Sequence, residues 1–423
     1  MRFGFFKDTG TKNDRLLVGL DIGTSKICAA VGEVCDTGLP GGRDVNIIGL
    51  GVAPSKGIKK GVVTNIESTV ESIKEAIAKA ETMAGVEIKA VQIGISGEHI
   101  DCFSSHGIIA VKEDEIGQRE VDSVMDAAKA VAIPFDREIL HVIPAGFTIN
   151  GQNGITDPRG MAGVRLETNV RIITGAATSV RNLVRSCQKA GLEVLDVVVQ
   201  PLASAEAVLS QDEKDLGTVV IDIGGGTTGI AIFHEGSICH SAVLAIGGNN
   251  FTNDVAIGLR ISTHEAERIK KEHGCSMLSL LKGDEEIDVG SEDERSNRRI
   301  PRRYLVEILQ PRAEELFSMI REEITGRGFY RKMSSGVVLT GGAVLMEGMD
   351  VMAENILELP VRIGVPAGMK DLREAAGDPS YAAAVGLAVF GAEDNLAAQG
   401  INKGNVLDGM SSRLKGWFSE TFK

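Results

Sequence analysis

The stretch VVIDIGGGTTGIAIF, from Val219 to Phe233, decides the fold class of this chain. It reads as an apolar strand, a glycine-rich turn and a second apolar strand, which is the pattern of a β-hairpin. The stretch LLVGLDIGTSKICAAVGEV, from Leu16 to Val34, has the same plan. Asp21 and Asp222 stand at matching positions, each followed by Ile-Gly. This repetition predicts two similar halves built in series.

The two turns carry the residue types that bind phosphate. Glycine lets backbone N–H groups converge on anionic oxygens, because it has no Cβ and adopts otherwise strained angles. A single hairpin of this kind is explained as well by a tight turn between core strands, but the duplication favours a shared ligand. Two carboxylates facing one triphosphate would repel it, so Asp21 and Asp222 predict a Mg²⁺ ion that keeps several waters. The predicted phosphate-binding residues are Gly23, Thr24, Ser25, Lys26, Gly224, Gly225, Gly226, Thr227 and Thr228.

A third glycine-containing turn follows the apolar segment Gly336–Thr340. Because ligands of open α/β sheets bind at strand ends, Gly341, Gly342 and Ala343 are predicted to let an adenine ring lie against the backbone. Neither a Walker A motif nor a Rossmann fingerprint is present at these sites. We therefore expect ATP in a cleft between the two halves.

Between these motifs helices and strands alternate, which favours an α/β fold. The segment Val91–Val111 reads instead as consecutive short strands, so a small α/β subdomain is expected within the first half. Helices are predicted at Glu67–Ala84, Glu120–Val131, Val180–Ala190, Thr263–His273 and Pro311–Thr325, and a strand at Ile139–Thr148.

Composition excludes several classes of protein. Of the 423 residues, 43% are hydrophobic and 24% are charged, as in an ordinary folded protein. The net charge of −13 argues against nucleic-acid binding, which requires a basic stripe. The six cysteines are scattered and form no CxxC pair, so neither a zinc site nor a disulfide framework is expected. No run approaches the about 20 apolar residues that span a bilayer, and the first residues lack a secretory signal, so a cytoplasmic location is expected.

At this point the motifs become recognisable. DIGTSK, VIDIGGGTTGIAIF and VLTGGA, in that order, are similar to the two phosphate loops and the adenosine loop of the actin and heat-shock-chaperone ATPase superfamily. Four further segments, ISGEHI, HVIP, GGNNFTNDVAIGL and AERIKKEHGC, narrow the match. From about Arg15 to Lys423 the chain resembles the FtsA family, the bacterial cell-division proteins that anchor the FtsZ ring to the membrane. The resemblance implies a two-lobed actin-like α/β fold with a duplicated core.

The resemblance also implies that Lys270 and Glu267 lie near the ribose. The alternative is a helix that packs on the core and exposes these charges to solvent.

The resemblance further implies a division of the chain into subdomains. The implied segments are subdomain 1A in residues 15–85 and 168–205, an inserted subdomain 1C in 86–167, subdomain 2A in 206–245 and 310–392, subdomain 2B in 246–309, a linker in 393–406 and a membrane-targeting helix in 407–423.

Gln200 stands where relatives that hydrolyse ATP readily place a Glu or Gln that orients the attacking water. A neutral amide positions water but cannot take its proton, so slow turnover at best is expected. The nucleotide would then act mainly as a ligand that stabilises lobe closure and self-association. The alternative is that Gln200 only caps local backbone groups.

The C-terminal stretch has apolar residues at helical spacing, so that they share one face. Arg413 and Lys415 flank that face, where they can reach anionic headgroups while the rings enter the acyl boundary. The alternative is a helix docked on the protein's own core, and the preceding polar linker favours membrane binding. The apolar residues of the predicted membrane-binding face are Leu407, Met410, Leu414, Trp417, Phe418 and Phe422.

The resemblance further implies the partners. The chain would self-associate into filaments, sit at the cytoplasmic face of the inner membrane at the division site, and recruit other division proteins. The FtsZ C-terminal tail would dock on the subdomain that contains Arg299, Arg302 and Arg303, whose guanidinium groups would pair with its carboxylates. Two other hypotheses remain open: a chaperone-type ATPase, although a long substrate-binding region is lacking, and an actin-like pilus-assembly protein of the PilM kind, which would not be expected to end in this helix.

Overall fold

Two five-stranded sheets with the same topology form the centre of the computed structural model, which describes residues 16–36, 43–283, 285–290, 298–369, 372, 375 and 377–398. In each sheet three antiparallel strands are followed by two parallel ones. This common order confirms the duplicated core. The first sheet has the order β3-β2-β1-β6-β11, with β1 (Leu16–Ile22), β2 (Lys26–Asp36), β3 (Arg43–Pro54), β6 (Ala90–Ile95) and β11 (Glu193–Val199). The second has the order β14-β13-β12-β17-β18, with β12 (Thr218–Ile223), β13 (Thr228–His234), β14 (Ser237–Leu244), β17 (Val337–Thr340) and β18 (Val361–Ile363).

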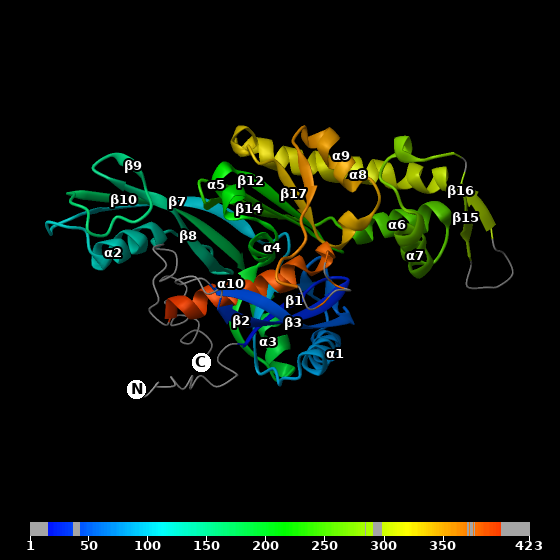
Figure 1. Ribbon diagram of the computed structural model, residues 1–423, viewed down its shortest axis with the longest axis horizontal. Coiled ribbons are helices and arrows are strands. Elements are labelled where there is room, and N and C mark those ends of the chain that lie inside the picture. The colour runs from blue at the N-terminus through cyan, green and yellow to red at the C-terminus, as the bar shows by residue number, and fades with distance from the viewer. Residues whose placement is uncertain are drawn as a thin grey trace, which may run out of the picture.

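Helices cover both sheets and fill the space between them (Figure 1). On the outer face of the first sheet lie α1 (Ile66–Ala84) and α3 (Ala177–Lys189); on that of the second lie α8 (Arg302–Gly326) and α9 (Met349–Leu357). Between the sheets α4 (Gln200–Val208) packs against α10 (Ala382–Ala398). Further short elements of the core include β4 (Ile58–Lys59), β5 (Val62–Val63) and α5 (Gln211–Leu216). Within the described residues, no helix is both long enough and apolar enough to cross a bilayer.

A separate four-stranded sheet extends from the first lobe (Figure 1). It has a hydrophobic core of its own, so the expected inserted α/β subdomain is present. The predicted run of strands from Val91 divides at Ser96, because β6 belongs to the central sheet and β7 to the insert. The insert's sheet therefore occupies residues 101–176. Its order is β7-β10-β8-β9, with β7 (Asp101–Ala110), α2 (Gln118–Lys129), β8 (Arg137–Ile149), β9 (Gln152–Ile155) and β10 (Arg165–Ala176).

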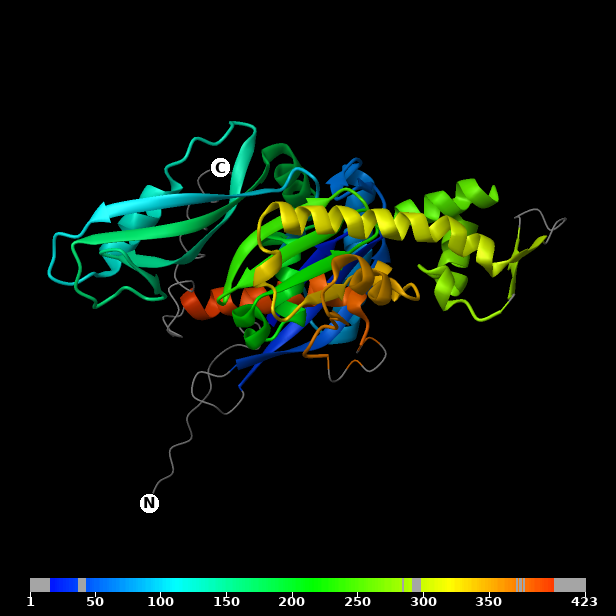
Figure 2. The ribbon, with the colours of Figure 1, turned by 90° about the horizontal axis from the view of Figure 1, so that it is seen from above.

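The opposite end of the molecule is helical, and α8 links it to the second sheet (Figure 2). The sequence predicts that this helix begins at Pro311, but it begins nine residues earlier, at Arg302. The earlier turns are kept helical because Leu305 and Leu309 are buried against the core. Tertiary packing thus outweighs the lost hydrogen bond of a proline inside the helix. The other elements at this end are α6 (Gly248–Leu259), α7 (Thr263–His273), β15 (Glu286–Val289) and β16 (Arg298–Pro301).

Candidate functional site

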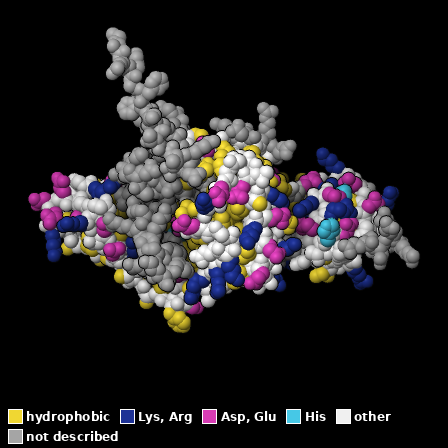
Figure 3. All heavy atoms as spheres, turned by 90° about the horizontal axis from the view of Figure 1, so that it is seen from below, with side chains coloured by type: hydrophobic (Ala, Val, Ile, Leu, Met, Phe, Trp, Pro, Cys, Tyr) yellow, Lys and Arg dark blue, Asp and Glu magenta, His cyan; other side chains and the backbone are white. Residues whose placement is uncertain are grey.

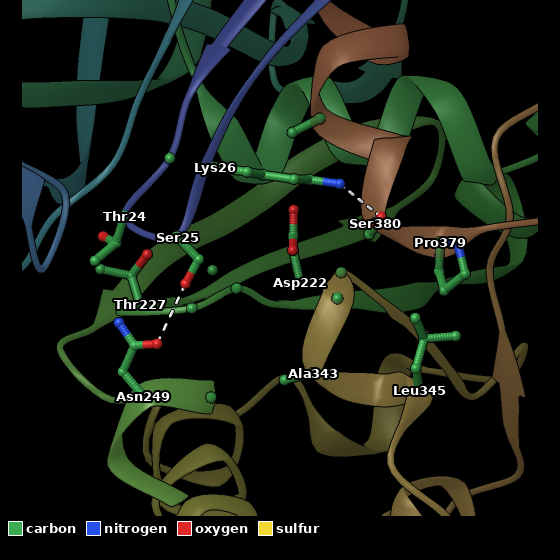
Figure 4. Close-up of a pocket in the computed structure, with 18 of the residues that line it drawn as sticks. Thr24, Ser25, Lys26, Asp222, Thr227, Asn249, Ala343, Leu345, Pro379 and Ser380 are labelled. Atoms are coloured by element: carbon green, nitrogen blue, oxygen red, sulfur yellow. Dashed lines mark hydrogen bonds between the residues drawn. The ribbon is translucent and has the colours of Figure 1, made fainter. Parts of the chain in front are cut away.

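A cavity of about 540 Å³ lies between the two lobes, at the turns of the two matched hairpins (Figure 4). Almost all residues that the sequence singles out for a nucleotide line it; Gly226 and Thr228 are the two that do not. The lining comprises Asp21, Gly23, Thr24, Ser25, Lys26, Ser96, Gln200, Pro201, Asp222, Gly224, Gly225, Thr227, Gly229, Gly248, Asn249, Phe251, Glu267, Lys270, Lys271, Gly341, Gly342, Ala343, Leu345, Met346, Pro379, Ser380 and Ala383.

The two hairpin turns have the same backbone geometry. Gly23 N–H donates to the carbonyl of Lys26 at 3.1 Å, and Gly224 N–H donates to the carbonyl of Thr227 at 2.9 Å. Within each turn the two middle residues, Thr24 and Ser25 or Gly225 and Gly226, donate their N–H groups to no acceptor in the described part of the chain. Thr24, Ser25 and Gly225 line the cavity, so unused donors are present on both of its sides, as an anionic ligand requires.

The turns also touch each other across the cleft. A Cβ added to Gly225 would lie 1.9 Å from Ser25 Oγ and 2.8 Å from Ser25 Cβ, and one added to Gly226 would lie 2.7 Å from Thr24 Oγ1. Gly226 is thus used for close approach of the lobes. Thr228 is buried and its hydroxyl donates to the Ile246 carbonyl at 2.8 Å, so its role in this structure is structural.

Asp21 and Asp222 face the cavity from opposite lobes. Burial, with the charge of Asp222 nearby, raises the pKa of Asp21 to about 7. Burial also raises the pKa of Asp222, although a hydrogen bond from Ser204 and the charge of Lys26 oppose the shift. Gln200 Nε2 donates to Asp21 Oδ1. Two buried carboxylates with one lysine nearby form a site that favours a cation.

No group of three or more His, Cys, Asp or Glu in the part of the chain that the structure describes is placed to hold a metal ion. The two carboxylates therefore fit a metal only if further ligands come from elsewhere. The oxygens of a triphosphate and water supply such ligands for Mg²⁺, which is usually held by one or two carboxylates. The two carboxylates, completed by phosphate and water oxygens, are thus suitable ligands for the expected Mg²⁺ ion.

Lys26 reaches across the cavity from the first hairpin (Figure 4). Its Nζ donates to Ser380 Oγ at 2.6 Å and lies 4.1 Å from the centre of the Tyr381 ring. Asp378 accepts a hydrogen bond from Ser380 N at 2.8 Å and so fixes the turn before α10. The ammonium group therefore lies close enough to the cavity to meet a phosphate.

The other end of the cavity is formed by the turn after β17. Gly341 has φ 91°, and a Cβ there would lie 2.4 Å from Asp222 Oδ1, so only glycine fits. Ala343 and Leu345 provide an apolar wall beside it. The facing helix α7 carries Lys270, whose Nζ donates to Glu267 Oε2 at 2.6 Å and to the Gly248 carbonyl at 3.0 Å. Both residues named for the ribose thus lie at the cavity.

Sequence reasoning missed four polar residues of the lining, Ser96, Asn249, Lys271 and Ser380. Ser96 Oγ donates to Thr227 Oγ1 at 3.2 Å, and Ser25 Oγ donates to Asn249 Oδ1 at 3.2 Å, so both contacts join one lobe to the other. The duplication contained a signal for Ser96, because it follows β6 as Gly341 follows β17. Asn249 and Ser380 had no comparable signal, since helix starts and turns often carry such residues.

The three arginines named for a partner lie at the helical end, where Figure 3 shows acidic and basic side chains mixed. Arg299 and Arg303 are 69% and 68% exposed and pair with Asp288 and Glu307. Arg302 is only 18% exposed, and its guanidinium bonds Glu285, Glu347 and the His273 carbonyl. It therefore holds local structure together. The membrane-binding residues named in 407–423 lie outside the described residues.

Comparisons with known proteins agree with the fold and the motifs. A family profile described as "Cell division protein FtsA" matches residues 219–386, and another, "SHS2 domain inserted in FTSA", matches residues 97–174. A cell division protein FtsA of Pseudomonas aeruginosa is 43% identical over 405 residues, which cover 96% of this chain and 93% of that protein. That of Escherichia coli strain K12 is 37% identical over 418 residues, covering 96% and 98%.

Solved structures with low identity share the fold. The structure titled "PilM-PilN type IV pilus biogenesis complex" matches with TM-score 0.61 and 17% identity, covering 89% of this chain and 98% of that one. MreB5 of Spiroplasma citri bound to ADP matches with TM-score 0.54 and 16% identity, covering 91% and 98%. These likenesses confirm the actin-like architecture.

Proposed function

Because the chain belongs to the FtsA family of cell division proteins, we propose that it is an ATP-binding adaptor that anchors the FtsZ ring to the cytoplasmic membrane. The observation that carries the nucleotide part is the pair of matched turns, which carry unused N–H groups and line one cavity together with Asp21 and Asp222. A role in cell division follows from the family; the ligand, the membrane and the FtsZ partner are the proposal.

In this proposal the phosphates lie between the two turns. Backbone N–H groups of Thr24, Ser25 and Gly225 would cradle the anionic oxygens. Lys26 would leave Ser380 for a phosphate, because a charge-assisted hydrogen bond to an anion is stronger than one to a hydroxyl. Asp21 and Asp222 would hold Mg²⁺, which would supply positive charge beside the phosphates.

The adenosine would occupy the end formed by Gly341, Gly342 and Ala343, where the glycines leave room for a flat ring. Lys270 and Glu267 already bond each other, so they present a fixed pair to the ribose hydroxyls. Gln200 would orient a water near the terminal phosphate, but its amide cannot accept the proton. Turnover is therefore expected to be slow.

Calorimetry on the full chain tests the nucleotide part. ATP with Mg²⁺ should bind with one site per chain, and GTP at the same concentration serves as the specificity control. Absence of any adenine-nucleotide heat from folded protein would remove the proposal, because the two turns would then be only a structural contact between lobes.

Membrane attachment is proposed for residues 407–423, with residues 393–406 as a linker. One short amphipathic helix gives reversible binding, so several chains side by side would be needed for stable anchoring. Self-association into filaments would supply them. Sedimentation with vesicles containing anionic lipid tests this: the full chain should pellet, and a chain ending at residue 406 should stay in the supernatant. Equal pelleting of both would place membrane binding elsewhere.

The FtsZ tail is proposed to dock at the helical end, within residues 246–309. There Ile257 on α6 and Tyr304 on α8 expose apolar surface, and Arg299 and Arg303 expose positive charge. An FtsZ tail with acidic and apolar side chains would contact both the positive charges and the apolar surface. Arg302 is a poor test position, since its loss would break three internal contacts.

Arg303→Glu is the sharper test of this surface. Its ion pair with Glu307 is exposed, so the change should cost little stability. Binding of a peptide with the FtsZ tail sequence should weaken about tenfold, which is about 1.4 kcal/mol. Arg185→Glu on α3 of the other lobe makes the same charge change as a control. Equal affinities in both variants would exclude Arg303 from the docking surface.

The inserted subdomain is proposed to contact other copies or other division proteins. The limits of the subdomains given by the sequence stay a proposal, although the insert's own sheet ends at Ala176. No residue of the insert is singled out for a partner.

A further inference from the structure

One helix holds a carboxylate from each lobe. Gln200 and Ser204 stand one turn apart on α4, at positions that share a helix face. Gln200 Nε2 donates to Asp21 Oδ1 of the first lobe. Ser204 Oγ donates to Asp222 Oδ2 of the second lobe at 2.5 Å. The two candidate metal-binding carboxylates are therefore attached to a single rigid element.

This helix has little freedom to move, because glycines in three different elements make room for it. A Cβ on Gly94 of β6 would lie 2.9 Å from Gln200 Cγ, and one on Gly229 of β13 would lie 2.6 Å from Pro201 Cγ. A Cβ on Gly386 of α10 would lie 1.7 Å from the Ala203 carbonyl oxygen. The helix is thus packed closely against both sheets and against α10.

The hydroxyl of Ser204 is not used for the helix itself. A buried serine inside a helix usually donates to a carbonyl in the preceding turn, as Ser186 on α3 does with the Asn182 carbonyl at 2.8 Å. Ser204 is equally buried, yet its donor is directed at a carboxylate of another element. Asp222 Oδ1 accepts no hydrogen bond in the described part of the chain, so this oxygen is left for a ligand.

We propose that Ser204 is a positioning residue for the cation: it fixes Asp222 Oδ2, so that Oδ1 faces the cleft at a set distance from Asp21. With Gln200 it makes α4 the element that determines the spacing of the two carboxylates. Because one helix sets the spacing of the two carboxylates, they are in place before the ligand binds. Less conformational entropy is therefore lost on binding. This inference rests on the proposed binding of ATP with Mg²⁺ at the same site.

Ser204→Ala in the full chain tests the inference, with ATP affinity measured by calorimetry in Mg²⁺ and in EDTA. The ratio of the two affinities reports the contribution of the ion. In Ser204→Ala this ratio should fall about tenfold, since a hydrogen bond to a charged group contributes about that much. Affinity in EDTA should stay close to that of the unchanged chain. Ser186→Ala, an equally buried serine far from the site, should leave the ratio unaltered.

Ser204→Cys keeps the shape of the side chain, in a slightly larger form and with a weaker donor, and it replaces Ser204→Ala if the latter fails to fold. An unchanged ratio, or an equal loss of affinity in Mg²⁺ and EDTA, would overturn the inference while the proposed function stands. If the unchanged chain bound no ATP with Mg²⁺, the proposed function would fail, and the inference would fail with it.

Discussion

Burial gives Asp21 a proton affinity that its sequence context alone does not reveal. Its pKa rises from 3.8 to about 7, chiefly because burial disfavours the charge. Between these values the folded protein holds a proton that the unfolded chain has lost. The free energy of unfolding contributed by this group therefore decreases as the pH rises from about 4 to about 7.

Asp21→Asn should remove this pH dependence. The amide oxygen still accepts from Gln200, but no charge is buried. The nucleotide-free variant should gain about 1–3 kcal/mol of unfolding free energy above about pH 7, and the gain should shrink toward about pH 4. Urea unfolding at several pH values measures it. Asp136→Asn, at an exposed position, is the control with the same change of charge. A gain in Asp21→Asn that is independent of pH would contradict the assignment.

At Gly225 the contact between the lobes leaves no room for a side chain. Gly225→Ala would place a Cβ 1.9 Å from Ser25 Oγ and 2.8 Å from Ser25 Cβ, so the turns must separate. Separation misplaces the N–H donors, and affinity for ATP with Mg²⁺ should fall by at least about tenfold. Gly326→Ala is the control, because an added Cβ there meets nothing within 4 Å. Similar affinities in both variants would show that the turns need not touch.

At the residue scale, the sequence predicts those residues of the site that occur at matching positions in both hairpins. Asp21, Asp222 and the turn residues were found because two hairpins carry them in the same order. Ser204 and Ser380 were not, because each acts through a contact between elements distant in the chain. No local pattern marks a buried serine that bonds a carboxylate 18 residues away.

At the scale of elements, the crossing of α4 and α10 determines how closely the two lobes approach. Gly386 is at this crossing, where an added Cβ would lie 1.7 Å from the Ala203 oxygen and 2.4 Å from its carbonyl carbon. Both are backbone atoms, so relief requires the helices to move apart.

Gly386→Ala should therefore lower the free energy of unfolding by about 1–3 kcal/mol through overpacking. Gly391→Ala in the same helix is the matched comparison, because its Cβ would meet only the Gln92 side chain, at 2.5 Å. That side chain can shift, so the loss should be smaller. Urea unfolding of the two variants measures the difference, and equal losses would mean that the crossing itself is not tight.

Element boundaries were predictable where periodicity was strong. The helix Thr263–His273 begins and ends as expected, since Ser262 caps its start and Gly274 follows its end. The start of α8 was missed because Pro311 is a local signal for a helix start, whereas burial of Leu305 and Leu309 is decided by the whole lobe. The division of β6 from β7 was missed for the same reason, since strand order depends on tertiary pairing.

At the scale of the whole molecule, the cleft makes nucleotide binding a property of both lobes together. The first lobe supplies Asp21 and one turn, the second supplies Asp222 and the other, and α4 connects them. A ligand that contacts both turns stabilises only the closed arrangement. Nucleotide binding should therefore reduce the mobility of both hairpins together.

Hydrogen exchange with and without ATP and Mg²⁺ provides the test. At about 100 times the Kd, the ligand should add about 2.7 kcal/mol to the stability of the states that bind it. Amides of residues 23–26 and 224–227 should then exchange more slowly to a similar degree, because one ligand orders both turns. Amides of α2 in the insert, which touches no part of the cavity, serve as the internal control. Protection limited to one hairpin would mean that the nucleotide binds a single lobe, and that the duplicated turns do not act as one site.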